Sequence, residues 1–121
     1  MGVEIPKRGQ IWEVNLDPTV GSEIKKRRPV VIISNDINNQ YAATVTILPI
    51  TGKGQRIYPF QVELSSKIKG LTKDSKIKCE QIRTVDKSRL ENLVGAIPPE
   101  IVKQIEQALL IHLGMDALER F

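Results

Sequence analysis

The chain has 121 residues, of which 40% are hydrophobic and 26% charged, as in a folded globular protein and unlike a disordered one. This length supports one hydrophobic core, so we expect a single domain spanning residues 1–121. No apolar run approaches the roughly 20 residues of a membrane span. Met1–Gln10 lacks the apolar core of a signal peptide, so the cytoplasm is the expected compartment. The single Cys79 and single His112 exclude an internal disulfide, a cysteine-based zinc site and histidine-pair chemistry within one chain.

The charge of the chain is positive and unevenly distributed. Lysine and arginine number 18 against 14 aspartates and glutamates, which gives a formal net charge of +4. The basic excess lies in Lys25–Arg28 and in Lys53–Lys78, whereas residues 100–121 carry more acidic than basic side chains. A localised basic excess suits a polyanionic partner such as nucleic acid. The acidic residues are scattered singly, so we expect neither a divalent-metal cluster nor another cofactor.

The first part of the chain predicts two strands separated by a loop. Apolar and polar residues alternate from Gln10 to Leu16, which predicts a half-buried strand ended by Asp17-Pro18. The polar and basic stretch Thr19–Arg28 predicts an exposed loop. The run Val30–Ile33 is β-branched throughout and predicts a buried strand. The segment Ser34–Gln40 is rich in Asn and Asp and predicts a turn.

The remainder predicts four further strands and one helix. The strands are expected at Thr44–Ile50, Tyr58–Leu64, Lys76–Val85 and Arg89–Ile97, the second of them near a sheet edge because it contains Pro59. From Pro99 to Leu113 the apolar residues recur at helical spacing, with Gly114 as a stop. Short strands followed by one C-terminal amphipathic helix indicate a mostly β (α+β) fold. We expect a small antiparallel β-barrel of SH3-like or OB-like type against which the helix packs.

Two side chains stand where a strand meets a loop. Arg28 ends the basic stretch and opens a buried strand, so the barrel would fix its position. Its planar guanidinium can hold phosphate oxygens through two hydrogen bonds. Thr51 ends a strand and precedes Gly52. Most threonines at such a position are ordinary turn residues. From spacing alone, a solvated basic loop at Lys25–Arg28 is the simpler interpretation.

The single histidine and the single cysteine are expected to be structural. His112 lies on the apolar face of the predicted helix, which favours a core or interface histidine. Cys79 lies in a predicted strand between apolar neighbours, which favours a packed, unreactive thiol. Neither residue is therefore a candidate catalyst.

Several spaced motifs resemble the MazF/PemK family. They are Arg8-Gly9-Gln10-Ile11-Trp12, Leu16-Asp17-Pro18, Gly21-Ser22-Glu23, Arg28-Pro29-Val30-Val31, Ile33-Ser34-Asn35-Asp36, Leu48-Pro49-Ile50-Thr51 and Glu80-Gln81-Ile82-Arg83-Thr84-Val85-Asp86. The resemblance covers about Lys7 to Leu113, and several motifs in order are more specific than any one. Members of that family are bacterial toxins of toxin–antitoxin pairs that act as sequence-selective endoribonucleases.

The resemblance implies a fold, a reaction and a set of site residues. It implies an SH3-like barrel that acts as a homodimer and cleaves single-stranded RNA without metal, leaving a 2′,3′-cyclic phosphate and a 5′-hydroxyl. By motif position, the essential arginine and threonine of the family fall on Arg28 and Thr51. The expected RNA-binding residues are Gly21, Ser22 and Glu23 of the mobile loop, the basic Lys25, Lys26 and Arg27, and Gln81 and Arg83 near the groove. The resemblance also implies an antitoxin partner whose acidic flexible segment would occupy the basic groove and compete with RNA.

The chemical roles and two alternatives stay open from the sequence. Arg28 suits stabilisation of phosphate charge, Thr51 suits positioning of the 2′-hydroxyl or phosphate, and Glu23 is either a general base or a solvated loop acid. With only five aromatic residues, broad base stacking on an aromatic sheet is not expected. The alternatives are a toxin of the same fold that poisons a protein such as DNA gyrase, and a non-catalytic RNA-binding barrel. The basic loop and the strand opening at Arg28 favour the nuclease.

Overall fold

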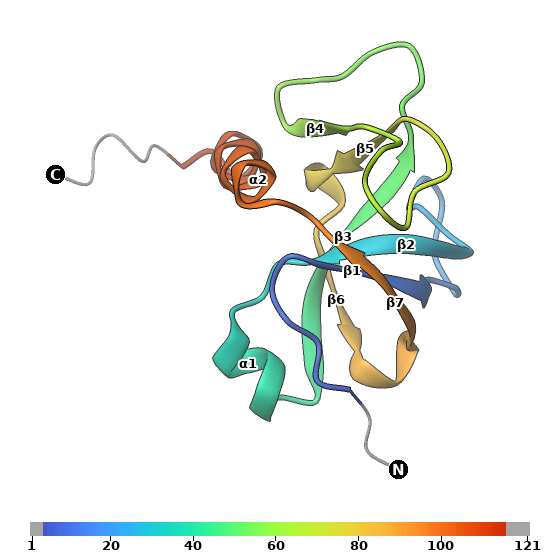
Figure 1. Ribbon diagram of the computed structural model, residues 1–121, viewed down its shortest axis with the longest axis vertical. Coiled ribbons are helices and arrows are strands. Elements are labelled where there is room, and N and C mark those ends of the chain that lie inside the picture. The colour runs from blue at the N-terminus through green and yellow to red at the C-terminus, as the bar shows by residue number, and fades with distance from the viewer. Residues whose placement is uncertain (1–3, 116–121) are drawn as a thin grey trace, which may run out of the picture.

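The computed structural model describes residues 4–115, which form one antiparallel sheet with a helix against it (Figure 1). Its elements are β1 (Gln10–Asn15), β2 (Arg27–Ile32), α1 (Asp36–Tyr41), β3 (Thr44–Gly52), β4 (Gln61–Leu64), β5 (Ser75–Lys78), the 3₁₀ turn η1 (Cys79–Gln81), β6 (Arg83–Asp86), the 3₁₀ turn η2 (Lys87–Arg89), β7 (Leu90–Ala96) and α2 (Pro99–His112). The ends of the expected domain, residues 1–3 and 116–121, lie outside the described residues. The expectation of a mostly β fold with a C-terminal helix is confirmed.

The long strand β3 joins the two parts of the sheet. The strand order is β4-β5-β3-β2-β1-β7, and β6 pairs with β3 off this path. Residues Thr44–Ile47 of β3 pair with β6, whereas Ile50–Gly52 pair with β5. In Figure 1, β4, β5 and α2 therefore lie on one side of the molecule and β6 lies on the other. The end strands β4 and β7 do not pair with each other, so the barrel is open.

Strand alternation divides the core into two apolar clusters. The neighbours Val30 and Val31 are both fully buried, yet Val31 packs in the cluster beneath α2 and Val30 packs in the cluster around Trp12. Successive side chains of a strand point to opposite faces, so burial on both faces explains why this run is continuously apolar. From α2, Ile105 and Ala108 reach the first cluster. Each large apolar side chain buried in this way contributes about 1.5–3 kcal/mol before conformational entropy is counted.

The segment expected to be a turn, Ser34–Gln40, instead contains the short helix α1. The side chain of Asn35 accepts a hydrogen bond from the backbone N–H of Asn38 at 2.8 Å and caps the helix. Asn39 is fully buried, and its amide nitrogen donates to the carbonyl of Ser34 at 2.8 Å. Of the side chains that suggested a turn, Asn35 thus caps the helix and the buried Asn39 holds the helix to the preceding backbone through a hydrogen bond.

Two expected strand boundaries were wrong. The predicted strand Lys76–Val85 is interrupted by η1, because its first part pairs with one end of β3 and its last part pairs with the other end. The predicted strand at Tyr58–Leu64 begins only at Gln61, and β4 is an edge strand, as expected from the nearby proline. The basic stretch also ends earlier than expected, since Arg27 and Arg28 already belong to β2.

The cysteine meets its expectation, whereas for the histidine the core is excluded and an interface stays a prediction. Cys79 is fully buried, and this burial raises the pKa of its thiol to about 12. His112 is exposed rather than in the core, and its ring lies 6.3 Å from the ring centre of Phe60. The last turn of α2 has left the barrel surface, so helical spacing alone overestimated the buried face. Within residues 4–115, no helix combines the length and apolar character needed to cross a membrane.

Candidate nucleic-acid interface and active site

Arg28 and Thr51 line the same cavity, which has a volume of about 260 Å³. The β2–β3 ladder pairs Val30 with Pro49, and two positions further along each strand are Arg28 and Thr51. Both residues are partly buried. The antiparallel register therefore brings together the two residues that the sequence singled out at the ends of separate strands.

The Arg28 guanidinium is held at one end. Its Nε donates a hydrogen bond to the carbonyl of Lys25 at 3.0 Å. Within the described part of the chain, its two terminal nitrogens make no hydrogen bond to protein. A guanidinium oriented in this way presents the geometry that binds two phosphate oxygens.

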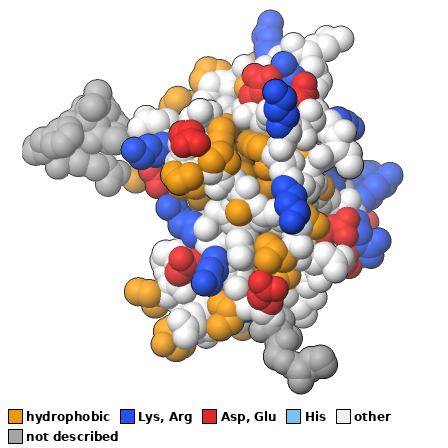
Figure 2. Space-filling model, viewed as in Figure 1, with side chains coloured by type: hydrophobic (Ala, Val, Ile, Leu, Met, Phe, Trp, Pro, Cys, Tyr) orange, Lys and Arg blue, Asp and Glu red, His pale blue; other side chains and the backbone are white. Residues whose placement is uncertain are grey.

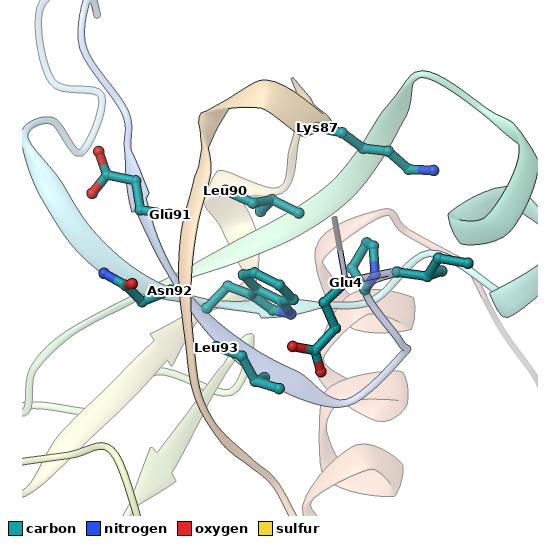
Figure 3. Close-up of a pocket in the computed structure, with 9 residues that line it drawn as sticks. Glu4, Lys87, Leu90, Glu91, Asn92 and Leu93 are labelled. Carbon is teal, nitrogen blue, oxygen red and sulfur yellow. The ribbon is translucent and has the colours of Figure 1, made fainter. Parts of the chain in front are cut away.

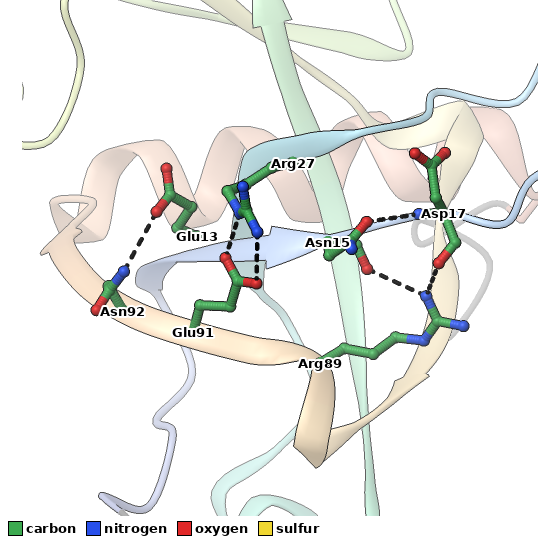
Figure 4. A network of polar contacts seen from close by, with 7 residues as sticks. All are labelled: Glu13, Asn15, Asp17, Arg27, Arg89, Glu91 and Asn92. Carbon is green, nitrogen blue, oxygen red and sulfur yellow. Dashed lines mark hydrogen bonds and ion pairs between the residues drawn. The ribbon is translucent and has the colours of Figure 1, made fainter.

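The loop between β1 and β2, residues 16–26, is closed at its base by a polar network (Figure 4). The guanidinium of Arg89 donates to the carbonyls of Asn15 at 3.1 Å and Asp17 at 2.6 Å. The Asp17 carboxylate accepts from the N–H of Lys26 at 3.1 Å, and Leu16 donates to the carbonyl of Lys26 at 2.9 Å. The loop therefore emerges from a fixed base.

Glu23 folds back on the tip of this loop. Its carboxylate accepts a hydrogen bond from the N–H of Val20 at 2.5 Å, and its own N–H donates to the Val20 carbonyl at 3.2 Å. Gly21 lies inside this turn at a positive φ of 59°, a conformation that favours glycine. In this state the Glu23 carboxylate is a structural acceptor for the turn.

Gln81 and Arg83 hold the other side of the loop. The side-chain oxygen of Gln81 accepts from the N–H of Ile24 at 2.7 Å, and its amide nitrogen lies 3.4 Å from the carbonyl of Ser22. Arg83 donates to the carbonyl of Leu16 at 3.4 Å. Ser22, Glu23, Gln81 and Arg83 line a second cavity of about 370 Å³. The structure thus gathers half of the expected RNA-binding residues, Ser22, Glu23, Gln81 and Arg83, into one groove between the loop and η1.

The three basic residues before Arg28 are not equivalent. Lys25 and Lys26 are exposed. Arg27 forms an ion pair with Glu91 through hydrogen bonds of 2.5 and 3.1 Å (Figure 4). The Glu91 carboxylate raises the pKa of Arg27, and Arg27 in turn lowers the pKa of Glu91. The charge of Arg27 is therefore already matched by a protein carboxylate.

Sequence reasoning did not place four polar side chains at the Arg28–Thr51 cavity, which are those of Glu13, Thr72, Lys73 and Ser75. The ammonium of Lys73 lies 3.2 Å from the place that a Cβ on Gly52 would occupy. Lys73 and Thr72 belong to a polar connection without hydrophobic periodicity, so only the basic excess of Lys53–Lys78 marked this stretch and nothing placed it near Arg28. Only the packing of this connection on β7 brings them to the cavity, and a Cβ at Gly70 would meet the Val94 carbonyl at 2.8 Å.

A different cavity, of about 560 Å³, lies between β7 and the N-terminal segment (Figure 3). It is lined by Glu4, Ile5, Pro6, Trp12, Lys87, Leu90, Glu91, Asn92 and Leu93, none of which was expected at the site. Its charged side chains are Glu4, Lys87 and Glu91, and Glu91 is paired with Arg27, so this cavity does not concentrate positive charge for a polyanion. In residues 4–115, no group of three His, Cys, Asp or Glu side chains is arranged to hold a metal ion.

The surface as a whole carries charges of both signs. Figure 2 shows Lys and Arg side chains interspersed with Asp and Glu on one face, around a central group of hydrophobic side chains. Specific binding of an anion must therefore rely on local groups such as Arg28. The structure is an open β-barrel in which one cavity holds an arginine guanidinium, fixed through its Nε, beside a threonine hydroxyl.

The family model described as PemK-like, MazF-like toxin of type II toxin–antitoxin system matches residues 7–113. The chain belongs to this family. It is a toxin of a type II toxin–antitoxin system by this family model, in agreement with the motifs that resembled the family.

The curated relatives are endoribonucleases of similar length. The chain is 40% identical over 114 residues to the endoribonuclease MazF9 of Mycobacterium tuberculosis, covering 90% of this chain and 97% of that protein. It is 39% identical over 112 residues to the endoribonuclease EndoA of Bacillus subtilis, covering 92% and 97%.

The fold matches solved structures of MazF proteins. The crystal structure of MazF from Deinococcus radiodurans superposes with a TM-score of 0.80 at 27% identity, covering 93% of this chain and all of that chain. A mycobacterial endoribonuclease in complex with its cognate antitoxin superposes with a TM-score of 0.76 at 25% identity, covering 92% and 97%. The expected fold class is thus confirmed by comparison with solved structures.

Proposed function

We propose that this toxin cleaves single-stranded RNA, mRNA in particular, at specific sequences and without a metal ion. The observation that carries the proposal is the cavity that Arg28 and Thr51 share at the end of the β2–β3 ladder. Family membership supplies the reaction class, and the partly buried arginine supplies the charge that such a reaction needs.

The reaction is attack of a ribose 2′-hydroxyl on the adjacent phosphorus. The proton of the 2′-hydroxyl passes to a base, either a water molecule or the Glu23 carboxylate once it is released, as the 2′-oxygen bonds to phosphorus. The bond from phosphorus to the 5′-oxygen breaks and that oxygen takes up a proton, leaving a 2′,3′-cyclic phosphate and a 5′-hydroxyl. Arg28 stabilises the negative charge that grows on the phosphate oxygens. It also donates a proton late to the leaving oxygen, when that oxygen has become strongly basic. Thr51 positions the 2′-hydroxyl or the phosphate through its own hydroxyl, since an alkyl hydroxyl rarely ionises.

The groove between the β1–β2 loop and η1 binds the flanking RNA. Ser22, Gln81 and Arg83 line it and supply hydrogen-bond donors and acceptors for base edges and phosphates. Glu23 acts as a general base only if substrate releases its carboxylate from the N–H of Val20. Lys25 and Lys26 add exposed positive charge, whereas Arg27 contributes less because Glu91 already pairs with it.

The protein acts as a homodimer in the cytoplasm, where mRNA is found. Ile111, Leu113 and Met115 near the end of α2 are 54%, 53% and 45% exposed in the single chain, which supports a subunit contact there. Its second partner is a cognate antitoxin, as in the mycobacterial complex. An acidic, flexible antitoxin segment competes with RNA for the same basic groove.

The deciding experiment is single-turnover cleavage of a long mixed-sequence RNA in excess EDTA, with the products mapped at both ends. The wild-type protein is compared with Arg28→Ala and with Lys103→Ala, which removes an exposed positive charge on α2 outside the Arg28–Thr51 cavity. Discrete cuts with cyclic-phosphate ends, lost only in Arg28→Ala, are expected. Activity lost in EDTA and restored by magnesium would overturn metal independence. Intact RNA with folded, antitoxin-free protein would favour a protein-directed toxin or a passive RNA binder.

A further inference from the structure

Two of the five aromatic residues and the single histidine lie together beside α2. The rings of Tyr58 and Phe60 are parallel to within 2°, and their centres are 5.5 Å apart. The guanidinium carbon of Arg56 lies over the Tyr58 ring, 5.5 Å from its centre. The ring of His112 follows Phe60 at 6.3 Å. We call Arg56, Tyr58, Phe60 and His112 the aromatic ladder.

The turn that carries the ladder is fixed from inside. Gln61 is 7% exposed, and its side-chain oxygen accepts a hydrogen bond from the N–H of Tyr58 at 3.1 Å. The N–H of Gln61 donates to the Tyr58 carbonyl at 2.9 Å, and Pro59 stiffens the turn between them. Tyr58 as a residue is nevertheless 43% exposed. A rigid, exposed ring loses little conformational entropy when a flat ligand stacks on it.

The ladder is connected to the expected catalytic residue Thr51. Strands β3 and β5 are paired so that Thr51 lies opposite Lys76. Adjacent strands lie about 4.8 Å apart. The ammonium of Lys76 then donates to the carbonyl of Arg56 at 2.9 Å. Only strand β5 therefore separates Thr51 from Arg56 of the aromatic ladder.

The ladder is also connected to the expected RNA groove. The amide nitrogen of Gln61 donates to the carboxylate of Glu80 at 2.8 Å, and Glu80 immediately precedes Gln81 in η1. Glu80 and Gln81 both line the groove beneath the β1–β2 loop. The Tyr58–Gln61 turn is thus hydrogen-bonded to η1, the 3₁₀ turn that lines the groove.

The charge beside the ladder favours an anionic ligand. Lys53 is neutralised by Glu63 at 2.6 Å, but the ion pairs formed among residues 4–115 include neither Arg56 nor Lys76. Two cations thus remain next to an exposed aromatic face. A nucleotide offers the complement of this arrangement, a flat base joined to a phosphate.

We propose that the aromatic ladder is a stacking site for one nucleobase of the RNA strand that passes Thr51. This inference rests on the proposed ribonuclease function. The base occupies the side of the Tyr58 ring that Arg56 now covers, and Arg56 turns to pair with a phosphate of the same strand. Broad base stacking on an aromatic sheet was not expected from five aromatic residues, and a single stacking site needs only the two that lie together here. A second copy of the chain is the competing occupant of this surface, and the molecular mass of the Tyr58 variants tests it.

The test uses a short RNA that contains the mapped cleavage sequence and a 2′-deoxyribose at the cut, so that it binds without being cleaved. The fluorescent base 2-aminopurine replaces one base at a time on both sides of the cut. Quenching at one position is expected with the wild-type protein and with Tyr58→Phe. Tyr58→Leu keeps an apolar side chain without a π-face, so we expect it to abolish that quenching and to weaken binding about tenfold. Tyr41→Leu is the matched control, because Tyr41 is 78% exposed on α1.

Cleavage of the unmodified RNA by the same preparations separates the two proposals. Failure of the wild-type protein to cleave or bind any RNA would overturn the proposed function and, with it, the stacking site. Normal cleavage, with quenching equal in wild type and Tyr58→Leu or absent at every position, would overturn the stacking site alone. The molecular mass of each variant in solution is measured as well. A Tyr58→Leu protein that dissociates into single chains and quenches like the wild type would assign the ladder to a subunit contact instead.

Discussion

The side-chain oxygen of Gln81 accepts a hydrogen bond from the backbone N–H of Ile24 at 2.7 Å. These residues belong to η1 and to the β1–β2 loop, so one side chain fastens the loop to the sheet. The same amide lies 3.4 Å from the carbonyl of Ser22. The position of the loop over its groove thus depends on a residue that is distant in sequence.

Replacing Gln81 with Ala should loosen the loop without unfolding the protein. A net hydrogen bond contributes about 0.5–1.5 kcal/mol, so amide exchange at Ile24 should accelerate about 2- to 10-fold. RNA binding should weaken because the groove loses one wall. Hydrogen exchange followed by mass spectrometry, with the exposed Gln107→Ala as control, measures the effect. Unchanged exchange at Ile24 would show that other contacts hold the loop.

Thr51→Ala should lower the single-turnover cleavage rate at least tenfold, because the hydroxyl that positions the reacting groups is removed. Thr51→Ser keeps that hydroxyl and should stay within about threefold of the wild-type rate. Both variants should unfold at the wild-type temperature. A Thr51→Ala enzyme as fast as the wild type would refute a role in positioning.

Arg28→Lys separates charge from geometry. Lysine keeps the positive charge but cannot form two parallel hydrogen bonds to a phosphate. We therefore expect Arg28→Lys to lose at least tenfold in rate and Arg28→Ala to lose all measurable cleavage. Thermal unfolding serves as the control for folding. Arg28→Ala activity within twofold of the wild type would remove Arg28 from the mechanism.

RNA affinity should fall steeply as salt rises, because a phosphate-led interface releases counterions. Lys25→Gln should reduce the slope of log affinity against log salt by about 0.7, the value for one phosphate contact on a single strand. Arg27→Gln should change the slope less, because Arg27 is paired with Glu91. Fluorescence anisotropy at several salt concentrations measures the slopes. Equal effects of the two substitutions would mean that RNA breaks the Arg27–Glu91 pair.

Cys79 should resist alkylation in the folded protein. Its burial raises the pKa of the thiol to about 12, so the reactive thiolate is scarce at pH 8 and the sulfur is covered. Iodoacetamide should label Cys79 only after denaturant is added, as measured by intact mass. Rapid labelling of the native protein would show that the first apolar cluster opens readily.

Local sequence patterns predicted most of the strands and α2 correctly, because one buried face imposes a fixed hydrophobic spacing. They failed where a side-chain hydrogen bond or a change of strand partner, rather than hydrophobic spacing, decides the local structure. Asn35 caps α1 instead of closing a turn, and η1 divides a predicted strand because β3 offers two different partners along its length. His112 follows the helical spacing but lies beyond the end of the core.

The sequence by itself determined the mostly β class, the buried strands, the C-terminal helix and the family, since alternation, helical spacing and motif order are all local along the chain. It also pointed to Arg28 and Thr51. Only the tertiary structure decided that these two share a cavity, that Gln81 holds the β1–β2 loop and that Glu91 neutralises Arg27. Such relationships depend on strand register and loop packing, which join residues that no local spacing connects.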